Sequence, residues 1–142
     1  MPTRKATAVW NGTLQQGNGN MKTPTGTVDQ PFSFSSRFEN GQGSNPEELL
    51  ASAHAGCFSM ALSLAISEAG YEPKSIETED TIHLEKDDSG FSITKIETHT
   101  KANIPGIDND TFQKHAQETQ QNCPVSKALK SVNLELNAEL SN

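Results

Sequence analysis

The chain has few basic and few apolar residues for its length. Of its 142 residues, 11 are Lys or Arg and 18 are Asp or Glu, so the formal net charge is −7. So acidic a chain is poorly suited to phosphate backbones or anionic membranes, and we expect neither nucleic acid nor a membrane as partner. Hydrophobic residues make up 32% of the chain. This small supply predicts a thin core and favours burial against a second subunit.

Signals for export and for membrane insertion are also lacking. The N-terminal stretch MPTRKATAVWNG contains no apolar h-region, so the sequence predicts no secretory signal. The one long apolar run, from Asn45 to Gly70, contains His54 and several serines, which favours a buried helix over a membrane span. We therefore expect a cytoplasmic protein. Reducing cytosol disfavours a permanent disulfide between its two cysteines.

Turn and cap residues divide the chain into alternating and helical segments. Asn45 suits a helix N-cap, Pro46 the first helical position, and Gly70 a C-cap, so a long helix is expected between them. The helix is apolar on most of its circumference, which predicts a central position. The predicted elements of one domain, 1–142, are strands within 3–38, the long helix at 46–70, a hairpin at 75–104, helices at 108–121 and 124–130, and a strand at 132–140. This order indicates an α+β fold with antiparallel sheet.

The predicted hairpin has apolar residues on one face. The apolar side chains of that face are Ile76, Ile82, Leu84, Phe91, Ile93 and Ile96. We expect this face to be buried. His83 and His99 are then most simply exposed strand residues.

Two cysteines are the sharpest chemical feature of the sequence. Cys123 precedes the predicted helix at 124–130, where unpaired N–H groups and the helix dipole favour a thiolate. Cys57 lies in the middle of the long helix, where apolar surroundings raise a thiol pKa. A lone buried cysteine is most often a packing residue. From local context alone, Cys123 is the better nucleophile, and Cys57 needs a nearby cation to compete.

Arginine is scarce, occurring only at Arg4 and Arg37. Arg37 ends the alternating segment FSFSSRF, in which a strand would place Arg37 on the face opposite the phenylalanines Phe32, Phe34 and Phe38. One interpretation is a solvated strand face. The other pairs the guanidinium with a carboxylate at the start of the long helix and aims its remaining donors at a thiolate.

Helical geometry indicates which carboxylate this would be. At about 100° per residue, Glu48 falls roughly opposite Cys57, whereas Glu47 falls about 80° from it. Glu47 is therefore the better placed partner for Arg37. Complementing the helix dipole is a simpler role that Glu47 would fill equally well.

Histidines offer a rival arrangement. His54, Cys57, His115 and Cys123 supply the ligand types of a tetrahedral zinc site. Their spacing matches no compact zinc motif, and His54 sits about 60° from Cys57 around the helix. Both observations disfavour the zinc hypothesis.

Three segments together resemble the osmotically inducible protein C (OsmC) family, which is related to the organic hydroperoxide resistance proteins. The segments are RFENGQGSNPEELLASAHAGCFSMALSLAISEAG, ITKIETHTKANIPGID and CPVSKALK. Specific motifs are a cysteine eleven positions after Pro46 and a second cysteine before Pro-Val-Ser. The similarity runs from about Ala8 to Leu136 and fits the OsmC subgroup.

The resemblance implies a thiol peroxidase that reduces organic hydroperoxides without a metal, haem or flavin cofactor. It implies that Cys57 is the peroxidatic cysteine, Cys123 the resolving cysteine, and that Arg37 and Glu47 complete the catalytic site. It also implies an intertwined homodimer, with antiparallel sheets packed on a long central helix. The implied reductant is a dithiol, such as a lipoyl group on a protein, and the implied role is defence against oxidative or osmotic stress.

These implications reverse the ranking of the cysteines that local context suggests. Cys57 can act as nucleophile if Arg37 holds its thiolate and stabilises the leaving alkoxide. Cys57 would become a sulfenic acid and then form a disulfide with Cys123. The alternative hypothesis is a non-enzymatic scaffold that holds a small hydrophobic ligand.

Overall fold

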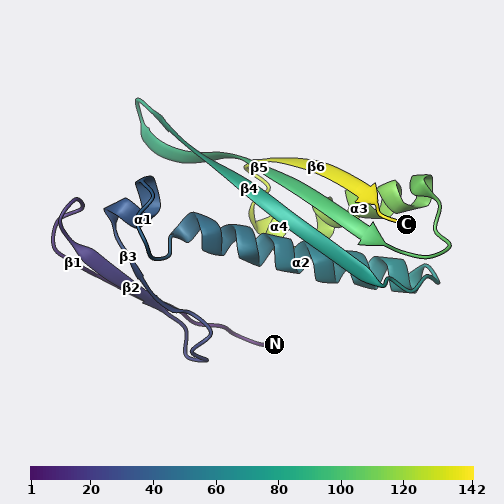
Figure 1. Cartoon of the computed structure of the whole chain (residues 1–142), viewed down its shortest axis with the longest axis horizontal. Helices are drawn as coiled ribbons and strands as arrows, with labels where there is room; N and C mark the ends of the chain where they lie inside the picture. The colour runs from purple at the N-terminus through teal and green to yellow at the C-terminus, as the bar shows by residue number, and fades with distance from the viewer. The chain divides into compact units, whose positions relative to one another are not determined.

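The computed structural model describes the whole chain, Met1 to Asn142. Its internal contacts divide it into two compact units, Met1–Leu49 and Leu50–Asn142. The elements are β1 (Thr7–Asn11), β2 (Asn18–Lys22), β3 (Asp29–Phe32), α1 (Phe34–Phe38), α2 (Pro46–Glu68), β4 (Ser75–Asp87), β5 (Gly90–Asn103), α3 (Asn109–Asn122), α4 (Pro124–Ala128) and β6 (Asn133–Leu140) (Figure 1). The predicted α+β class is confirmed. A single domain over 1–142 stays a prediction.

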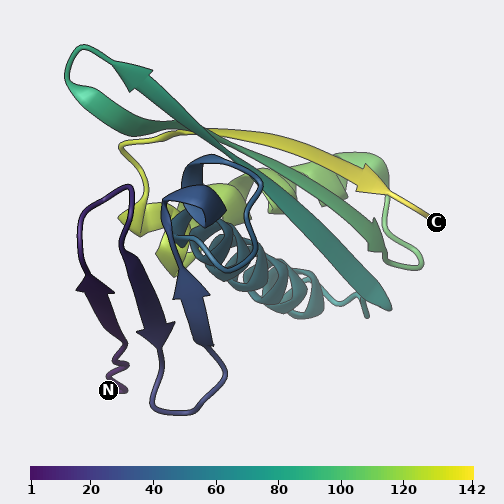
Figure 2. The same cartoon turned by 60° about the vertical axis from the view of Figure 1, so that its left-hand side comes forward.

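The first unit is built on a three-stranded antiparallel sheet in the order β1-β2-β3 (Figure 2). Gly19 on the central strand pairs with Trp10 on one side and with Phe32 on the other. The rings of these two residues contact each other, with centroids 5.3 Å apart. A Cβ at Gly19 would lie 2.6 Å from the Phe32 ring and 2.8 Å from the Trp10 ring. The glycine therefore allows the two rings to close over the strand.

Residues 34–38 form the short helix α1, where alternation predicted a strand, so this part of the strand prediction is wrong. The Ser33 hydroxyl accepts the N–H of Ser36 at 3.1 Å, and the Ser36 hydroxyl accepts the N–H of Ser33 at 2.9 Å. This reciprocal pair is a capping box, which starts a helix. The helical i,i+4 spacing then brings the rings of Phe34 and Phe38 to 5.1 Å between centroids.

Helix α2 has the two caps that the sequence predicted. At its start, Oδ1 of Asn45 accepts the N–H of Glu48 at 2.8 Å. At its end, Gly70 has a φ of 95°, and the N–H of Tyr71 donates to the carbonyl of Ile66 at 3.1 Å, as in a Schellman motif. The left-handed conformation at Gly70 is one that L residues with a side chain rarely adopt.

The second unit contains a three-stranded sheet in the order β4-β5-β6. The antiparallel hairpin β4–β5 is confirmed, with a register shift between His83 and Leu84. A bulge of this kind changes which side chains face the core beyond it. Here the extra residue in β5 keeps Ile93 and Phe91 on the same face as Ile96, so Phe91 lies on the predicted apolar face, but near the hairpin tip, where it is 52% exposed.

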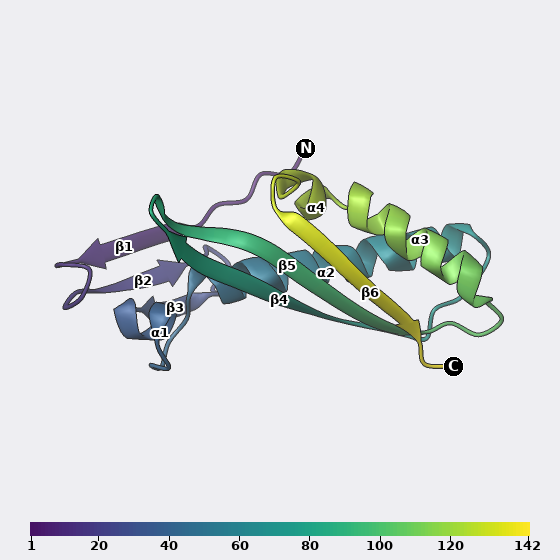
Figure 3. The same cartoon turned by 90° about the horizontal axis from the view of Figure 1, so that it is seen from above.

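Strand β6 runs parallel to β5, which differs from the antiparallel pairing that we expected throughout. The chain leaves β5, passes through α3 and α4, and returns before it enters β6 (Figure 3). A crossover of this length is what a parallel pair requires, because its strands must start at the same end of the sheet.

The core of the second unit lies between its sheet and the helices α2 and α3. Its buried residues are Phe58, Leu62, Ile66, Ala102, Ile104, Ile107, Phe112 and Ala116. Helix α2 buries one side, whereas Met60 and Leu64 on another side are 78% and 60% exposed. By length and composition α2 would also suit a membrane span, a property that it shares with core helices of soluble proteins.

Candidate active site

Arg37 and Glu47 form an ion pair within the first unit. Arg37 stands in the last turn of α1 and Glu47 in the first turn of α2. Nε and Nη2 of the guanidinium both donate to Oε1 of Glu47, at 3.1 and 2.8 Å. The Glu47 side chain is 13% exposed and that of Arg37 38%. The neighbouring Glu48 is exposed, so the prediction that Glu47 is the paired carboxylate is confirmed.

Hydrogen bonds between the two helix caps hold this pair in place. The Ser36 hydroxyl, which belongs to the cap of α1, donates to the carbonyl of Ser44 at 2.7 Å. The side-chain amide of Asn45, the N-cap of α2, donates to the carbonyl of Ser36 at 3.1 Å. Because α1 and the first turn of α2 are tied through these residues, Arg37 meets Glu47 across the loop.

A small cavity adjoins Arg37 on the same unit. Its volume is about 270 Å³, and its lining residues are Trp10, Leu14, Phe32, Ser33, Phe34, Arg37 and Phe38. The guanidinium carbon of Arg37 lies 5.2 Å from the centre of the Phe38 ring. A single cation among apolar walls suits a ligand with an apolar body and a polar or anionic end.

Cys57 and Cys123 meet as free thiols in the second unit. Cys57 is half-buried on α2, Cys123 is 2% exposed, and the two side chains lie close enough to interact. Burial raises the pKa of the Cys57 thiol, a hydrogen bond from the Val125 backbone opposes this, and the Cys123 side chain raises the pKa further. The expectation that apolar surroundings raise the pKa of Cys57 is confirmed. The second unit by itself therefore favours the protonated thiol at this position.

Cys123 occupies the junction at which α3 ends and α4 begins. Its N–H donates to the carbonyl of Thr119 at 2.9 Å and closes α3. Its sulfur accepts the N–H of Ser126 at 3.4 Å and caps α4, whose first residue is Pro124. The prediction that Cys123 stands at the mouth of a helix is confirmed.

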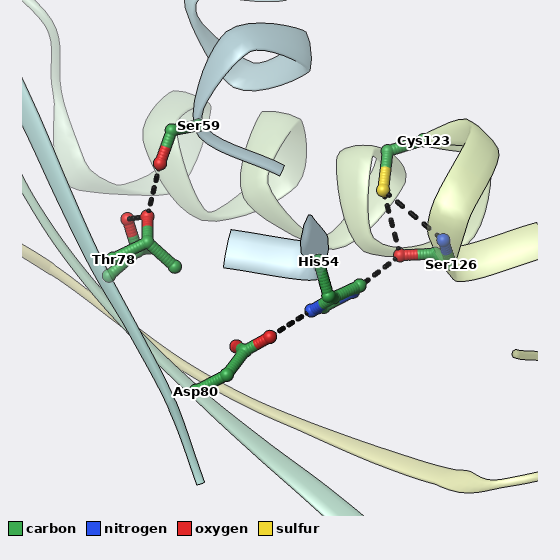
Figure 4. A network of polar contacts seen from close by, with 7 residues as sticks. His54, Ser59, Thr78, Asp80, Cys123 and Ser126 are labelled. Carbon is green, nitrogen blue, oxygen red and sulfur yellow. Dashed lines mark hydrogen bonds and ion pairs between the residues drawn. The ribbon is translucent and has the colours of Figure 1, made fainter. Parts of the chain in front are cut away.

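A buried chain of polar side chains leads from Cys123 to β4, and sequence patterns did not predict it (Figure 4). The Ser126 hydroxyl lies 2.9 Å from the sulfur of Cys123 and 2.8 Å from Nε2 of His54. Nδ1 of His54 is bonded to Oδ2 of Asp80. His54 and Asp80 side chains are fully buried.

This chain changes the interpretation of His54. Both of its ring nitrogens are engaged by Asp80 and Ser126, and no group of three or more His, Cys, Asp or Glu side chains is arranged to hold a metal ion. The zinc arrangement with His115 therefore does not form. One sequence signal for the observed chain exists: alternation in β4 places Asp80 on the same face as the half-buried Ile82.

The four predicted site residues thus form two pairs. Arg37 and Glu47 meet in the first unit, and Cys57 and Cys123 meet in the second. Glu47 and Cys57 are ten positions apart along α2. The catalytic roles predicted for the four residues stay predictions.

The chain is similar to known proteins along most of its length. The family described as OsmC-like protein matches residues 39–137. Peroxiredoxin OsmC of Escherichia coli strain K12 is 46% identical over 129 residues, covering 90% of each chain. The crystal structure of the organic hydroperoxide resistance protein OhrB of Bacillus subtilis superposes with a TM-score of 0.70 at 27% identity, covering 96% of this chain and 98% of that one.

A more distant structure shares the fold alone. The OsmC-like protein of Mycoplasma pneumoniae superposes with a TM-score of 0.79 at 15% identity, covering 99% of each chain. The family match spans most of the chain, and it includes Glu47, Cys57 and Cys123. The chain belongs to the OsmC-like protein family.

Proposed function

We propose that this chain is a thiol peroxidase that reduces organic hydroperoxides to alcohols, with Cys57 as the peroxidatic and Cys123 as the resolving cysteine. The observation that carries the proposal is the contact between the two free thiols. Relatives named peroxiredoxin OsmC and organic hydroperoxide resistance protein support a peroxidase-type activity.

The proposed reaction has two steps before the enzyme is recycled. The Cys57 thiolate attacks the distal peroxide oxygen, the O–O bond breaks, and the alkoxide takes a proton and leaves as alcohol. Cys57 is then a sulfenic acid. Cys123 attacks its sulfur, hydroxide leaves as water, and a disulfide forms. An external dithiol, such as a lipoyl group on a protein, reduces that disulfide by exchange.

Arg37 and Glu47 have defined tasks in this proposal. Because burial raises the pKa of Cys57, a nearby positive charge is needed to keep its thiolate at neutral pH. Arg37 supplies that charge and stabilises the developing alkoxide, while the two bonds to Glu47 orient the guanidinium. The apolar walls of the cavity beside Arg37 take the organic part of the substrate.

We also propose that the protein works as a cytoplasmic homodimer. The exposed Met60 and Leu64 make one side of α2 apolar, and burial against a second copy would cover it. Two free thiols with no disulfide suit a reducing compartment. A role in defence against oxidative or osmotic stress follows from the chemistry and from the family.

One experiment tests the assignment of the two cysteines. Reduced protein is treated with one equivalent of cumene hydroperoxide, and the products are mapped by mass spectrometry. We expect a Cys57–Cys123 disulfide, and in Cys123→Ser we expect Cys57 to proceed to sulfinic acid. Full dithiol-dependent turnover in Cys57→Ser would contradict the assignment. Unmodified cysteines together with ligand-dependent thermal stabilisation would favour a binding scaffold instead.

A further inference from the structure

The chain Cys123–Ser126–His54–Asp80 joins a thiol to a buried carboxylate through one hydroxyl and one imidazole (Figure 4). We propose that Ser126, His54 and Asp80 form a proton relay that ionises Cys123 when it attacks the sulfenic acid of Cys57. The inference rests on the proposed function, in which Cys123 resolves that sulfenic acid. Ser126 touches the reacting sulfur, and His54 and Asp80 act through Ser126.

Burial makes an internal proton acceptor necessary. The exposed fraction is 2% for Cys123, 1% for Ser126 and zero for His54. A proton that leaves the Cys123 sulfur therefore has no direct route to solvent. Apart from Cys57, which is the reaction partner, the side chain bonded to that sulfur is the Ser126 hydroxyl, which in turn reaches the imidazole.

The hydrogen-bond partners fix the direction of transfer. A carboxylate only accepts, so Nδ1 of His54 carries the proton that is donated to Asp80. In the neutral ring Nε2 is then an acceptor and takes the Ser126 O–H, which leaves the Ser126 oxygen to accept from the Cys123 thiol.

The same atoms also suit the state after transfer. With the proton on Nε2, the imidazolium donates to Ser126, and the Ser126 hydroxyl donates to the Cys123 thiolate. The N–H of Ser126 donates to that sulfur as well, at 3.4 Å. No heavy atom has to move, because only the donor and acceptor roles reverse. The Asp80 carboxylate beside the imidazolium stabilises the charge that forms.

The relay accounts for every proton in the second step of the proposed reaction, in which the disulfide forms. Ser126 gives its proton to Nε2 of His54 and receives the proton of the Cys123 thiol. The thiolate then forms the S–S bond with Cys57, and the S–O bond of the sulfenic acid breaks. The departing hydroxide takes one proton, and the relay returns to its neutral state. The products are one disulfide and one water.

The environment of His54 contains few other titratable groups. Asp80 faces it from β4, Cys123 lies at the head of α4 beyond Ser126, and Cys57 lies three positions along α2. The buried residues of β5 are Ile96, Thr98, Thr100 and Ala102, none of which titrates. A change in the pH dependence of Cys123 chemistry on mutation of His54 can therefore be assigned to the relay.

A neighbouring network in the same layer provides a matched control. The Ser59 hydroxyl donates to the Thr78 hydroxyl at 2.8 Å (Figure 4). The Thr78 hydroxyl lies 3.0 Å from the Thr100 hydroxyl. Ser59 belongs to α2, as His54 does, but its bonds lead through hydroxyl groups to a backbone carbonyl and reach no titratable side chain. Ser59→Ala therefore removes an interior hydroxyl bond without touching the relay.

The first test needs no peroxide. In a Cys57→Ser background, Cys123 is the only thiol, and its rate of reaction with methyl methanethiosulfonate is followed by mass spectrometry from pH 5 to 9. We expect Ser126→Ala and His54→Gln to react about tenfold or more slowly at pH 7, and Ser59→Ala to stay within about twofold. In the two relay variants the pH dependence of the rate should also differ from that of the parent protein, whereas Ser59→Ala should keep it. Equal rates and pH profiles in all variants would overturn the relay.

The second test uses the native cysteines and one equivalent of cumene hydroperoxide in a quenched-flow experiment. We expect Ser126→Ala to form the Cys57 sulfenic acid at the normal rate and the disulfide about tenfold or more slowly. If disulfide formation is unchanged, the relay is wrong. If the first test succeeds and Cys57 does not react with peroxide, the proposed function fails and the relay stands. If either relay variant does not fold, the other decides.

Discussion

Replacing Arg37 by alanine leaves the carboxylate of Glu47 without a hydrogen-bond partner. The Glu47 side chain is 13% exposed, Oε1 loses both of its donors, and Oε2 already has no partner. An exposed ion pair contributes about 0.2–1 kcal/mol, whereas a buried group left unsatisfied costs about 1–3 kcal/mol. The guanidinium is 38% exposed and the carboxylate is mostly buried. The free-energy cost of the substitution should therefore lie between the value for an exposed ion pair and that for a buried unsatisfied group. We expect the free energy of unfolding to fall by about 1–2 kcal/mol.

Urea unfolding followed by circular dichroism measures this change. The double variant Arg37→Ala/Glu47→Gln should recover about half of the loss, because a neutral amide is easier to bury than an unpaired carboxylate. The matched control is Arg4→Ala, since Arg4 is exposed and bonds only the carbonyl of its neighbour Thr3. That control should change the unfolding free energy by less than about 0.5 kcal/mol. A double variant less stable than Arg37→Ala would refute the reasoning on the stranded carboxylate.

The same variant tests the chemical role of Arg37. If its charge holds the Cys57 thiolate and stabilises the alkoxide, sulfenic acid formation with cumene hydroperoxide should slow by about 10²–10³. The rate is measured by stopped flow on protein whose circular dichroism is unchanged, again beside Arg4→Ala. A rate equal to that of the wild type would remove Arg37 from the site.

Three further predictions follow from burial and exposure. Burial is the main cause that raises the pKa of Cys57, and the Cys123 side chain raises it further. In Cys123→Ser, the rate of Cys57 alkylation by iodoacetamide should therefore reach half of its plateau value at a lower pH. An unshifted midpoint would contradict the effect of Cys123 on the pKa of Cys57. Phe58 is fully buried, so Phe58→Ala should lower the free energy of unfolding in urea by about 3–5 kcal/mol. A loss of less than about 1 kcal/mol would contradict its position in the core. If the proposed homodimer forms through this side of α2, Met60→Lys with Leu64→Lys should shift the mass measured by light scattering from dimer to monomer, and an unchanged dimer would place the interface elsewhere.

Local patterns determined much of this fold. Asn45 and Gly70 marked the ends of α2 because caps depend on residues within one helical turn. The hairpin β4–β5 and the position of Cys123 at the head of α4 were predicted for the same reason. The partner of Arg37 could also be predicted, because helical periodicity distinguishes Glu47 from its neighbour Glu48.

Predictions failed where two local patterns fit the same residues. The segment at 34–38 alternates as a strand does, yet the Ser33–Ser36 capping box and the i,i+4 spacing of its phenylalanines serve a helix equally well. In the hairpin, the bulge opposite His83 and Leu84 keeps Phe91 on the predicted apolar face, but Phe91 lies near the tip and is 52% exposed, which alternation alone does not reveal. The parallel direction of β6 depends on where the α3–α4 crossover returns, which no local pattern records.

The sequence by itself determined the caps of α2, the hairpin β4–β5, the acidic character of the chain and the residue types of the candidate site. Only the tertiary structure decided that Cys57 meets Cys123 and that Cys123 continues through Ser126 and His54 to Asp80. The links of His54 span 26 positions to Asp80 and 72 positions to Ser126. Such contacts depend on strand register and on the crossover together, so periodicity within one segment cannot predict them.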